Sequence, residues 1–580
     1  MSFAFTHSAI TTLCLLGLSW SSDSHARDQP PPEAASGLKP VQIIQSPAQH
    51  GQSGVCVTAN PDATQACLQQ LQVGGSAADG ALAAAWMLGL VEPQSSGLGG
   101  GGYLVYFDGK HVINLDGRET APQLALSNRF LRPNGQPLGF REAVVSGLSV
   151  GTPSMVALMQ EMHRRFGQRP WASSLQPAIA MAKNGFAVGP RLHQLLRLDQ
   201  QLAQSSAAEY FYPNGQALAV GVRRTNPAYA QTLSQIAQHG STVFYQGSLA
   251  ANISSAIQAH NGDLTIEDLA RYQVTTHPAL CQTLTSYQVC GMGPSSSGGI
   301  AVLQSLAMLQ GQYTDNAITN MTRLTNAERL AFADRDAYLA DDQFVNVPTP
   351  ALLDPNYLKQ RQRLAIGPRL NQVQAGLIQR APSGEGIDAP NTTHISVVDA
   401  QGRAASMTLS IESAFGSRIW IKSGGFLLNN ELTDFSFVPQ KNGQQVANRV
   451  QAGKRPRSSM SPTLILNAEG KQVDGVLGSP GGSQIIGYVV QAAWGLINGQ
   501  TVRDVLEQPH VLRRGDDTEL EQGRFSDKQK QALIDAGHSL KEGEMTSGLA
   551  IIWRQNDRFV AGADPRREGT ALAVHPLSTE

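Results

Sequence analysis

The feature that most constrains this chain is an abrupt change of pattern at residues 391–394, Asn-Thr-Thr-His. Residues 380–390 before it are rich in Pro and Gly and hold little that can pack. Residues 393–400 and 403–412 after it predict two strands that are joined by a turn at 400–402. Thr392 therefore stands where a loop meets the first strand of a sheet.

A cut before Thr392 would change the chemistry of this residue. A threonine hydroxyl is a weak nucleophile unless a neighbouring base takes its proton. A new N-terminus supplies that base, because an α-amino group has a pKa of about 7.7–8.0, close to working pH. Threonine also favours strands, so a plain strand start is the simpler interpretation of residues 391–392 alone. The rest of the chain has to decide between the two.

Length and composition favour a globular enzyme. A chain of 580 residues is too long for one small core and predicts two or more substructures. The formal net charge of -1 gives no indication of a nucleic-acid partner or of an anionic membrane surface. Charged residues make up 15% of the chain and apolar residues 41%, which argues against bulk disorder.

The N-terminus is typical of an export signal. Residues 9–20 form a short, mostly apolar run, followed by Ser24-His25-Ala26, a small-x-small cleavage pattern, although no Lys or Arg precedes the run. The run is too short to span a bilayer. We expect a signal peptide over residues 1–26, a Pro-rich linker over 27–40, and a periplasmic or secreted protein.

Four cysteines remain after the signal: Cys56, Cys67, Cys281 and Cys290. Two close pairs in an exported protein favour two local disulfides, although four cysteines allow three pairings. The chain has neither Cys-x-x-Cys nor His-Glu-x-x-His spacing, so the sequence gives no indication of a zinc site.

Helices and strands are mixed along the chain. Apolar periodicity predicts helices over 77–92, 155–166, 175–183 and 483–497. It predicts strands over 103–107, 393–400, 403–412, 463–467, 472–478 and 547–553. The order lacks the regular alternation of a parallel α/β barrel.

Two short motifs suggest other functions. Residues 97–102 satisfy G-x-G-x-x-G, but a helix precedes them and a strand follows, the reverse of a dinucleotide site. Residues 147–151 satisfy G-x-S-x-G, which would present Ser149 as a nucleophile between a strand at Val144-Val145 and a helix near Pro153. The region ahead lacks the repeated βα units of that fold, so Ser149 is the weaker alternative.

A glycine pair precedes the predicted helix at 483. Gly481 and Gly482 end the run Gly-Ser-Pro-Gly-Gly over 478–482. Backbone N–H groups at a helix start are free and can hold an oxyanion, and glycine lets a substrate approach the backbone closely. A plain turn into a helix explains the run equally well.

Charged and hydroxyl side chains could recognise the two ends of an amino acid. The groups suited to a carboxylate are Arg118, Arg455, Arg457, Ser458 and Ser459. The groups suited to an ammonium are Glu412, Glu431 and Asp434. Each alone is more often a solvated surface residue. Together they make sense if they converge on one ligand that carries both charges.

Eight stretches together resemble the γ-glutamyltranspeptidase family of N-terminal-nucleophile hydrolases. In chain order they are 92–101, 116–122, 293–299, 391–399, 426–436, 454–463, 478–482 and 563–566. The resemblance implies an α/β (α+β) fold, a four-layer αββα sandwich made as one precursor. It further implies autocleavage between Asn391 and Thr392, which gives a large subunit over 41–391 and a small, catalytic subunit over 392–580 that pair as a heterodimer.

The resemblance also implies roles for individual residues. Thr392 would be the nucleophile, Gly481 and Gly482 the oxyanion donors, and Ser410 the hydroxyl at a position where the family often has Thr. Arg118, Ser458 and Ser459 would hold the substrate α-carboxylate, and Asp434 its α-amino group. Glu412 and Glu431 stand where some members have Asn and Gln, and they make the expected pocket more anionic.

The implied activity is cleavage of γ-glutamyl amides such as glutathione, with the acyl group passed from Thr392 to water or to amino acids and peptides. The resemblance implies neither a cofactor nor a metal, and no nucleic-acid or membrane partner. The loop between Asp434 and Ser458 is shorter than in members with a developed lid, so we expect hydrolysis to rival transfer. The alternatives are an acylase acting on glutaryl or cephalosporin-type side chains, a Ser149 hydrolase, and an uncleaved binding protein.

Overall fold

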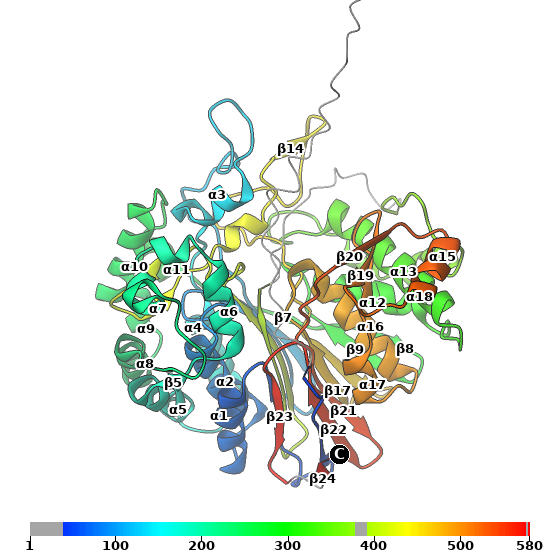
Figure 1. Cartoon of the computed structure of the whole chain (residues 1–580), viewed down its shortest axis with the longest axis horizontal. Coiled ribbons are helices and arrows are strands. Elements are labelled where there is room, and N and C mark those ends of the chain that lie inside the picture. The colour runs from blue at the N-terminus through cyan, green and yellow to red at the C-terminus, as the bar shows by residue number, and fades with distance from the viewer. Residues whose placement is uncertain (1–38, 377–390, 576–577, 580) are drawn as a thin grey trace, which may run out of the picture.

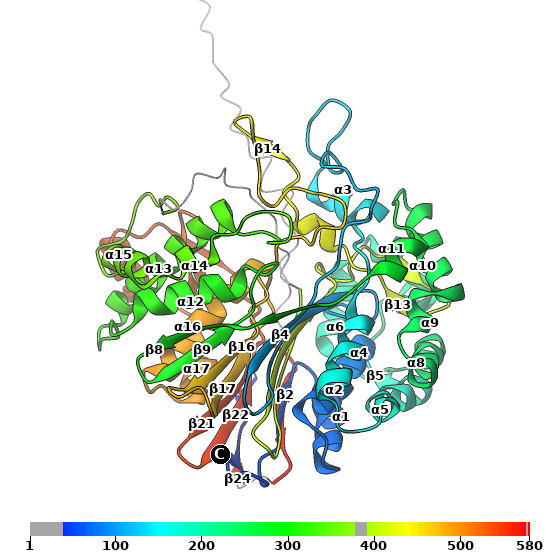
Figure 2. The ribbon, with the colours of Figure 1, turned by 180° about the vertical axis from the view of Figure 1, so that it is seen from behind.

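The computed structural model describes residues 39–376, 391–575 and 578–579. Two β-sheets pack face to face, and helices cover the outer face of each (Figures 1 and 2). The expected four-layer αββα sandwich is therefore confirmed. The expected signal peptide and most of the expected linker lie outside the described residues.

The first sheet has seven strands in the order β23-β2-β10-β11-β3-β4-β7. These are Thr570–Ala573, Val55–Thr58, Thr393–Val398, Ala404–Ser410, Gly101–Phe107, Val112–Gly117 and Thr275–Pro278. Neighbouring strands run antiparallel throughout.

The second sheet has eight strands in the order β24-β1-β22-β21-β17-β16-β9-β8. These are Ser578–Thr579, Ile43–Pro47, Arg558–Ala563, Ala550–Gln555, Val473–Gly478, Thr463–Asn467, Tyr287–Gly291 and Leu280–Leu284. All of these pairs are antiparallel as well.

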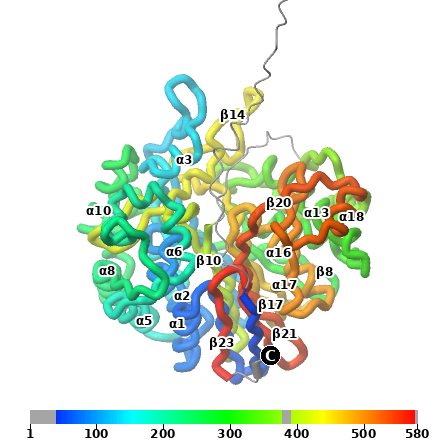
Figure 3. The backbone as a smooth tube through the Cα atoms, viewed as in Figure 1, coloured from blue at the N-terminus to red at the C-terminus, as the bar shows by residue number. Residues whose placement is uncertain are grey.

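Strands from the two sides of residue 391 are interleaved in both sheets. In the first sheet β10 and β11 lie between β2 and β3, which come from the N-terminal part of the chain. In the second sheet β1 lies between β22 and β24. Figure 3 shows the blue N-terminal and red C-terminal segments running side by side. Each sheet is thus built from both parts of the chain.

Helices of the first outer layer follow from apolar sequence, and side-chain caps start three of them, α1, α2 and α8. They are α1 Pro61–Gln72, α2 Ala77–Val91, α4 Met155–Phe166, α5 Trp171–Asn184, α6 Pro190–Leu198, α8 Pro227–His239 and α10 Gly247–Ala259. Helix α2 is buried along its whole length, and a capping box between Ser76 and Asp79 starts it. Its small side chains let it lie flat on β10 and β11.

Helices of the second outer layer are α12 Gly298–Leu309, α13 Ala317–Tyr338, α15 Pro355–Ala365, α16 Ile485–Ile497, α17 Val502–Glu507 and α18 Asp527–Asp535. Shorter helices are α3 Phe140–Val144, α7 Ala208–Phe211, α9 Thr242–Tyr245, α11 Ile266–Arg271 and α14 Thr349–Leu352. The remaining short strands are β5 Phe186–Ala187, β6 Arg223–Arg224, β12 Trp420–Ile421, β13 Phe426–Leu427, β14 Gln440–Lys441, β15 Gln444–Gln445, β18 Val511–Leu512, β19 Thr518–Glu521 and β20 Leu540–Gly543.

The expected helices at 77–92, 155–166, 175–183 and 483–497 and the six expected strands are all present, with ends shifted by a few residues. The strand expected at Val144-Val145 is wrong, because Val144 ends helix α3. Its apolar pair faces a small cluster with Phe140 rather than a sheet.

The four cysteines within the described ranges form two disulfides, Cys56–Cys67 and Cys281–Cys290. The first ties β2 to α1 and the second joins the paired strands β8 and β9. Within the described ranges, no helix combines the length and the apolar character that a bilayer crossing requires.

Candidate active site

Thr392 and Ser410 lie at the same end of two paired strands. Residue 393 opposite residue 409 sets the register of β10 and β11, and side chains alternate between the two faces of a strand. Ser396 and Ser406 on these strands donate hydrogen bonds to carbonyls of the second sheet, so even-numbered residues face that sheet. Thr392 and Ser410 therefore point into the space between the sheets, and both line one pocket there.

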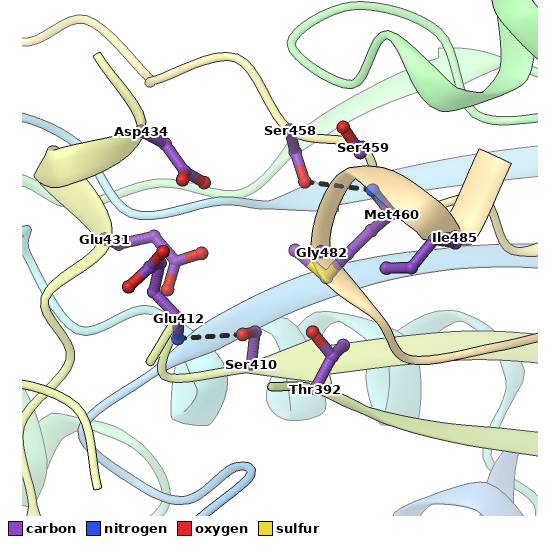
Figure 4. A pocket seen from close by; sticks show the side chains of 10 residues that line it. All are labelled: Thr392, Ser410, Glu412, Glu431, Asp434, Ser458, Ser459, Met460, Gly482 and Ile485. Carbon is purple, nitrogen blue, oxygen red and sulfur yellow. Dashed lines mark hydrogen bonds between the residues drawn. The ribbon is translucent and has the colours of Figure 1, made fainter. Parts of the chain in front are cut away.

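The ten residues that line this pocket are Thr392, Ser410, Glu412, Glu431, Asp434, Ser458, Ser459, Met460, Gly482 and Ile485 (Figure 4). Figure 4 shows the three acidic side chains on one side and the two serines on the opposite side, with Thr392 and Ser410 at the floor. The structure thus brings together eight of the residues that the sequence nominated for one site.

Ser410 holds the carbonyl of the Asn391–Thr392 peptide bond. Its Oγ donates to the Asn391 carbonyl oxygen at 3.0 Å and accepts from the Glu412 N–H at 2.8 Å. The second contact fixes the hydroxyl so that its proton points at the carbonyl. A donor on this oxygen would stabilise the negative charge that develops when the carbonyl carbon is attacked.

The acidic wall is organised by one buried arginine. Arg118 donates to Glu431 and to Asp434, and also to the backbone oxygens of Pro456 and Arg457 at 3.2 and 3.3 Å. Burial alone lowers the pKa of Arg118, but Glu431 and Asp434 outweigh it and raise the pKa well above its ordinary value. The guanidinium therefore stays charged, and it already binds two carboxylates of the pocket.

Glu412 is the third acid of this wall, and its backbone is strained. Its φ of +74° lies in the left-handed region, which costs a residue with a side chain about 1 kcal/mol or more. Its carboxylate accepts from the Ser413 hydroxyl at 2.5 Å and from the Asn430 amide. This wall thus comprises three carboxylates and the one guanidinium that pairs with Glu431 and Asp434, which gives it a negative formal charge.

A fourth carboxyl group lies behind the wall. Glu119 is fully buried, and neither of its carboxyl oxygens has a hydrogen-bond partner among the described residues. Burial, reinforced by the charge of Glu431, raises the pKa of Glu119 well above its usual range. Burial thus favours the neutral form of Glu119, which is not one of the residues that line the pocket.

The opposite wall carries Ser458 and Ser459. The Ser458 hydroxyl accepts from the Met460 N–H at 3.2 Å, and Arg335 donates to the Ser459 hydroxyl at 2.8 Å. The backbone oxygen of Ser458 is held by Ser297 through both its N–H, at 2.8 Å, and its hydroxyl, at 2.6 Å. Arg335 was not among the residues predicted from the sequence, because nothing in its local pattern in the last turn of α13 marks it as part of the site.

Gly481 and Gly482 turn the chain from β17 into the helix at Ile485. Their φ values are +137° and +57°, which only glycine adopts readily. A side chain at Gly481 would lie 2.7 Å from the ring of Tyr488. Gly482 lines the pocket and opens the short helix Gly482–Gln484. The first N–H groups of a helix have no partner within it, so they can face a ligand.

Three nominated residues lie elsewhere. Arg455 pairs with Asp116 at 3.3 Å and donates to the backbone of Gln273, in a neighbouring pocket. Arg457 lies 3.5 Å from Asp336. The Ser149 hydroxyl is buried and donates to backbone oxygens of residues 144 and 146, both at 2.8 Å, so it is not presented as a nucleophile.

Two buried arginines that the sequence did not single out hold the 391–392 junction. Arg191 donates to the side-chain oxygen of Asn391 at 2.9 Å, and Arg567 donates to the backbone oxygen of Thr392 at 3.0 Å. Burial lowers the pKa of both, that of Arg567 to about 10. Glu92 lies 3.9 Å from Arg191, and burial raises the pKa of Glu92 to about 8. No spacing pattern could have revealed these contacts, because Arg191 lies 200 positions from Asn391 and Arg567 lies 175 positions from Thr392.

The site combines a threonine hydroxyl, a hydrogen-bonded backbone carbonyl and a pocket with acidic and serine walls, an arrangement of groups that suits acyl transfer. No group of three or more side chains suited to hold a metal ion occurs in the part of the chain that the structure describes.

This chain is similar in sequence and in fold to several known proteins. The chain is 31% identical to a glutathione hydrolase proenzyme of Bacillus subtilis strain 168, over 97% of both chains. It is 33% identical to the Escherichia coli K12 glutathione hydrolase proenzyme, over 95% of this chain and 96% of the other. It is also 31% identical to an acylase ACY 1 proenzyme of Pseudomonas sp. SE83, over 90% and 94%.

A solved cephalosporin acylase from Bacillus halodurans shares the fold, with a TM-score of 0.81 and 24% identity over 93% of this chain and 98% of the other. The sequence model of the gamma-glutamyltranspeptidase family matches residues 63–574. That match covers most of the chain and includes every residue of the pocket. The chain therefore belongs to the γ-glutamyltranspeptidase family.

Proposed function

We propose that this protein is an exported precursor that cuts itself between Asn391 and Thr392 and then acts as a γ-glutamyltransferase and glutathione hydrolase. The observation that carries the proposal is the placement of Thr392 beside the Ser410-bound carbonyl of Asn391, at the floor of a pocket lined by three acids and two serines. Two disulfides support export, because such bonds persist in oxidising compartments.

Maturation begins when the Thr392 hydroxyl attacks the carbonyl carbon of Asn391. The C–N bond breaks, the acyl group moves to the hydroxyl as an ester, and the Thr392 nitrogen becomes a free α-amino group. Water then hydrolyses the ester, which leaves a carboxylate on Asn391 and restores the hydroxyl. The hydrogen bond from Ser410 supports the charge on the attacked carbonyl oxygen. The products are a large subunit ending at 391 and a small subunit beginning at 392, which stay together as a heterodimer.

In turnover the Thr392 hydroxyl attacks the γ-amide carbonyl of the substrate while its own α-amino group takes the proton. The N–H groups of Gly481 and Gly482 hold the oxyanion, the leaving amine takes a proton, and a γ-glutamyl ester forms. Water or the amine of an amino acid or peptide then attacks the ester and frees Thr392.

The pocket walls match the two charges of a γ-glutamyl group. The α-ammonium lies among Glu412, Glu431 and Asp434, where it adds positive charge to a wall in which Arg118 already pairs with Glu431 and Asp434. Arg118, Ser458 and Ser459 take the α-carboxylate. A glutaryl group lacks the ammonium and brings only negative charge to this wall.

The second candidate function is an acylase for glutaryl or cephalosporin-type side chains. It is favoured by the likeness to the acylase ACY 1 proenzyme, because this chain is 31% identical both to that protein and to the B. subtilis glutathione hydrolase proenzyme. The excess of carboxylates in the pocket argues against it.

A denaturing gel tests the proposed cleavage, and a comparison of two substrates tests the proposed activity. Purified protein is expected to run as two pieces under denaturing conditions, and N-terminal sequencing of the smaller piece is expected to begin at Thr392. Thr392→Ala is expected to stay in one piece and to have no activity. An intact wild-type chain that only binds glutamate would instead indicate a binding protein. The ratio of kcat/KM for γ-glutamyl and glutaryl p-nitroanilides then distinguishes the transferase from the acylase.

A further inference from the structure

Arg191 contacts the residue on the acyl side of the proposed cut. It lies in the first turn of α6 with its side chain 1% exposed. One terminal nitrogen donates to the Asn391 side-chain oxygen at 2.9 Å, and the other donates to the Ser95 hydroxyl at 3.0 Å. The Ser95 hydroxyl in turn lies 3.3 Å from the same Asn391 oxygen. Arg191 and Ser95 thus both donate to one atom of Asn391 and are hydrogen-bonded to each other.

The other end of the Asn391 amide is held as well. Its nitrogen donates to the backbone oxygen of Gln94, in the same turn as Ser95. Both polar atoms of the side chain are therefore tied to groups far away in the sequence. Because Ser410 also binds the Asn391 backbone oxygen, the whole residue is fixed relative to Thr392. Such fixing holds the attacked carbonyl in one orientation and lowers the entropic cost of the attack.

Arg567 makes a contact of a different kind on the other side of the bond. It donates to the backbone oxygen of Thr392, a group that stays with the nucleophile after the cut. The Asn391 side chain belongs instead to the end that the cut releases. A contact to Asn391 can orient the bond only while the bond exists.

Burial of the Arg191 guanidinium carries a desolvation cost, because the charge is removed from water. A buried guanidinium needs compensating partners: the Glu92 carboxylate lies 3.9 Å from it, and the Glu568 carboxylate, which accepts from the backbone N–H of Arg191 at 3.3 Å, is a second negative charge nearby. This buried network places a rigid, forked donor at the Asn391 side chain, a geometry that lysine cannot reproduce.

From this geometry we propose that Arg191 is a positioning residue for maturation, which orients Asn391 for attack by Thr392 and has no part in turnover of substrates. The inference rests on the proposed cleavage between Asn391 and Thr392. It separates two arginines at one junction: Arg191 serves the cut alone, whereas Arg567 serves both the cut and the mature nucleophile.

The test measures maturation and turnover separately in Arg191→Met, Asn391→Ala, the double variant and Arg567→Met. Each precursor is made by cell-free translation, and conversion to two chains is followed over time on denaturing gels. Loss of a hydrogen bond from a charged donor corresponds to a factor of about 10 to 100. Arg191→Met is expected to slow maturation by that factor, and the double variant is expected to be no slower than the slower single variant.

The matured fraction of each variant is then purified and assayed with γ-glutamyl p-nitroanilide. Arg191→Met is expected to keep kcat and KM within about twofold of wild type, whereas Arg567→Met lowers kcat. Ser95→Ala removes one hydroxyl from the same contact and is expected to slow maturation less. Because Ser95→Ala removes only one hydroxyl, it is expected to fold and to test the same contact if Arg191→Met does not fold. Thermal unfolding of each precursor shows whether it is folded.

Several outcomes would overturn the inference. The inference is wrong if a folded Arg191→Met precursor matures at the wild-type rate. It is also wrong if the slowing of maturation in the double variant equals the product of the slowing in Arg191→Met and in Asn391→Ala, because the two residues would then act independently. An equal loss of kcat in the matured Arg191→Met protein would place the residue in turnover instead. These failures differ from a failure of the proposed function, in which the wild-type small chain would not begin at Thr392.

Discussion

Replacing Ser410 with alanine isolates the contribution of one hydrogen bond to maturation. The hydroxyl donates to the Asn391 carbonyl oxygen at 3.0 Å and accepts from the Glu412 N–H at 2.8 Å. The two contacts have different consequences. The first strengthens as negative charge develops on the carbonyl oxygen, so it affects the rate of cleavage. The second is the same before and during the attack, so it affects mainly the stability of the fold.

The magnitudes follow from these roles. Removal of one oxyanion donor lowers a rate by about 10²- to 10³-fold, or about 2.7–4 kcal/mol. The Glu412 N–H, left without its acceptor in a buried place, costs about 1–3 kcal/mol of unfolding free energy. Ser410→Ala is therefore expected to mature about 100-fold more slowly or worse and to unfold at a lower urea concentration. Ser410→Thr keeps the hydroxyl and is expected to mature at close to the wild-type rate.

The assay is a cell-free translation that is stopped at intervals and analysed on a denaturing gel. Urea unfolding of Thr392→Ala and of the Thr392→Ala/Ser410→Ala double variant, both of which are expected to stay uncleaved, gives the stability difference separately. If Ser410→Ala matures within threefold of the wild-type rate while folded, the reasoning is wrong, because the carbonyl would then need no donor from this residue.

Three further predictions concern other parts of the molecule. Conversion of both Cys56 and Cys67 to serine is expected to lower the unfolding free energy by about 3 kcal/mol, from the closed loop of 11 residues, in a urea titration. Gly481→Ala is expected to lower kcat by about 100-fold with a smaller change in KM, because its φ is +137° and the new methyl group would meet Tyr488 at 2.7 Å and displace the oxyanion donors. Burial lowers the pKa of His394 to about 3, below its unfolded value of about 6.5. Since the unfolded chain binds the extra proton between these values, stability is expected to fall by about 4 to 5 kcal/mol as the pH drops through that window, and His394→Asn is expected to flatten this slope in urea titrations of the uncleaved chain.

The part of the site that was predictable from sequence is local. Residues 391–394 mark a loop meeting a strand, and the register of one hairpin then places Ser410 beside Thr392. Glu431 and Asp434 lie in one turn, and Ser458 and Ser459 are neighbours, so each pair enters the pocket together. Short-range pattern and strand alternation were sufficient for these residues.

The remainder depends on distant contacts that no spacing encodes. Arg455 and Arg457 come directly before Ser458 and Ser459 in the sequence, yet their side chains pair with acids outside the pocket. Arg118, 313 positions before Glu431, binds two acids of its own site. Arg191 and Arg567, the buried arginines at the 391–392 junction, were not predicted either, because a charged residue in a sequence is more often exposed.

The interleaved sheets have a consequence for how the proposed heterodimer can be taken apart. Strands β10 and β11 of the proposed small subunit are hydrogen-bonded on both sides to β2 and β3 of the proposed large one, so the two pieces share both sheets of the sandwich. The precursor folds as one chain, in a reaction whose rate does not depend on protein concentration. Once the chain is cut, the same native state can be regained only by an encounter of two separate molecules, each lacking half of its sheet partners. Cleavage would thus leave the contacts of the folded state in place while it turns a reversible folding reaction into a concentration-dependent assembly.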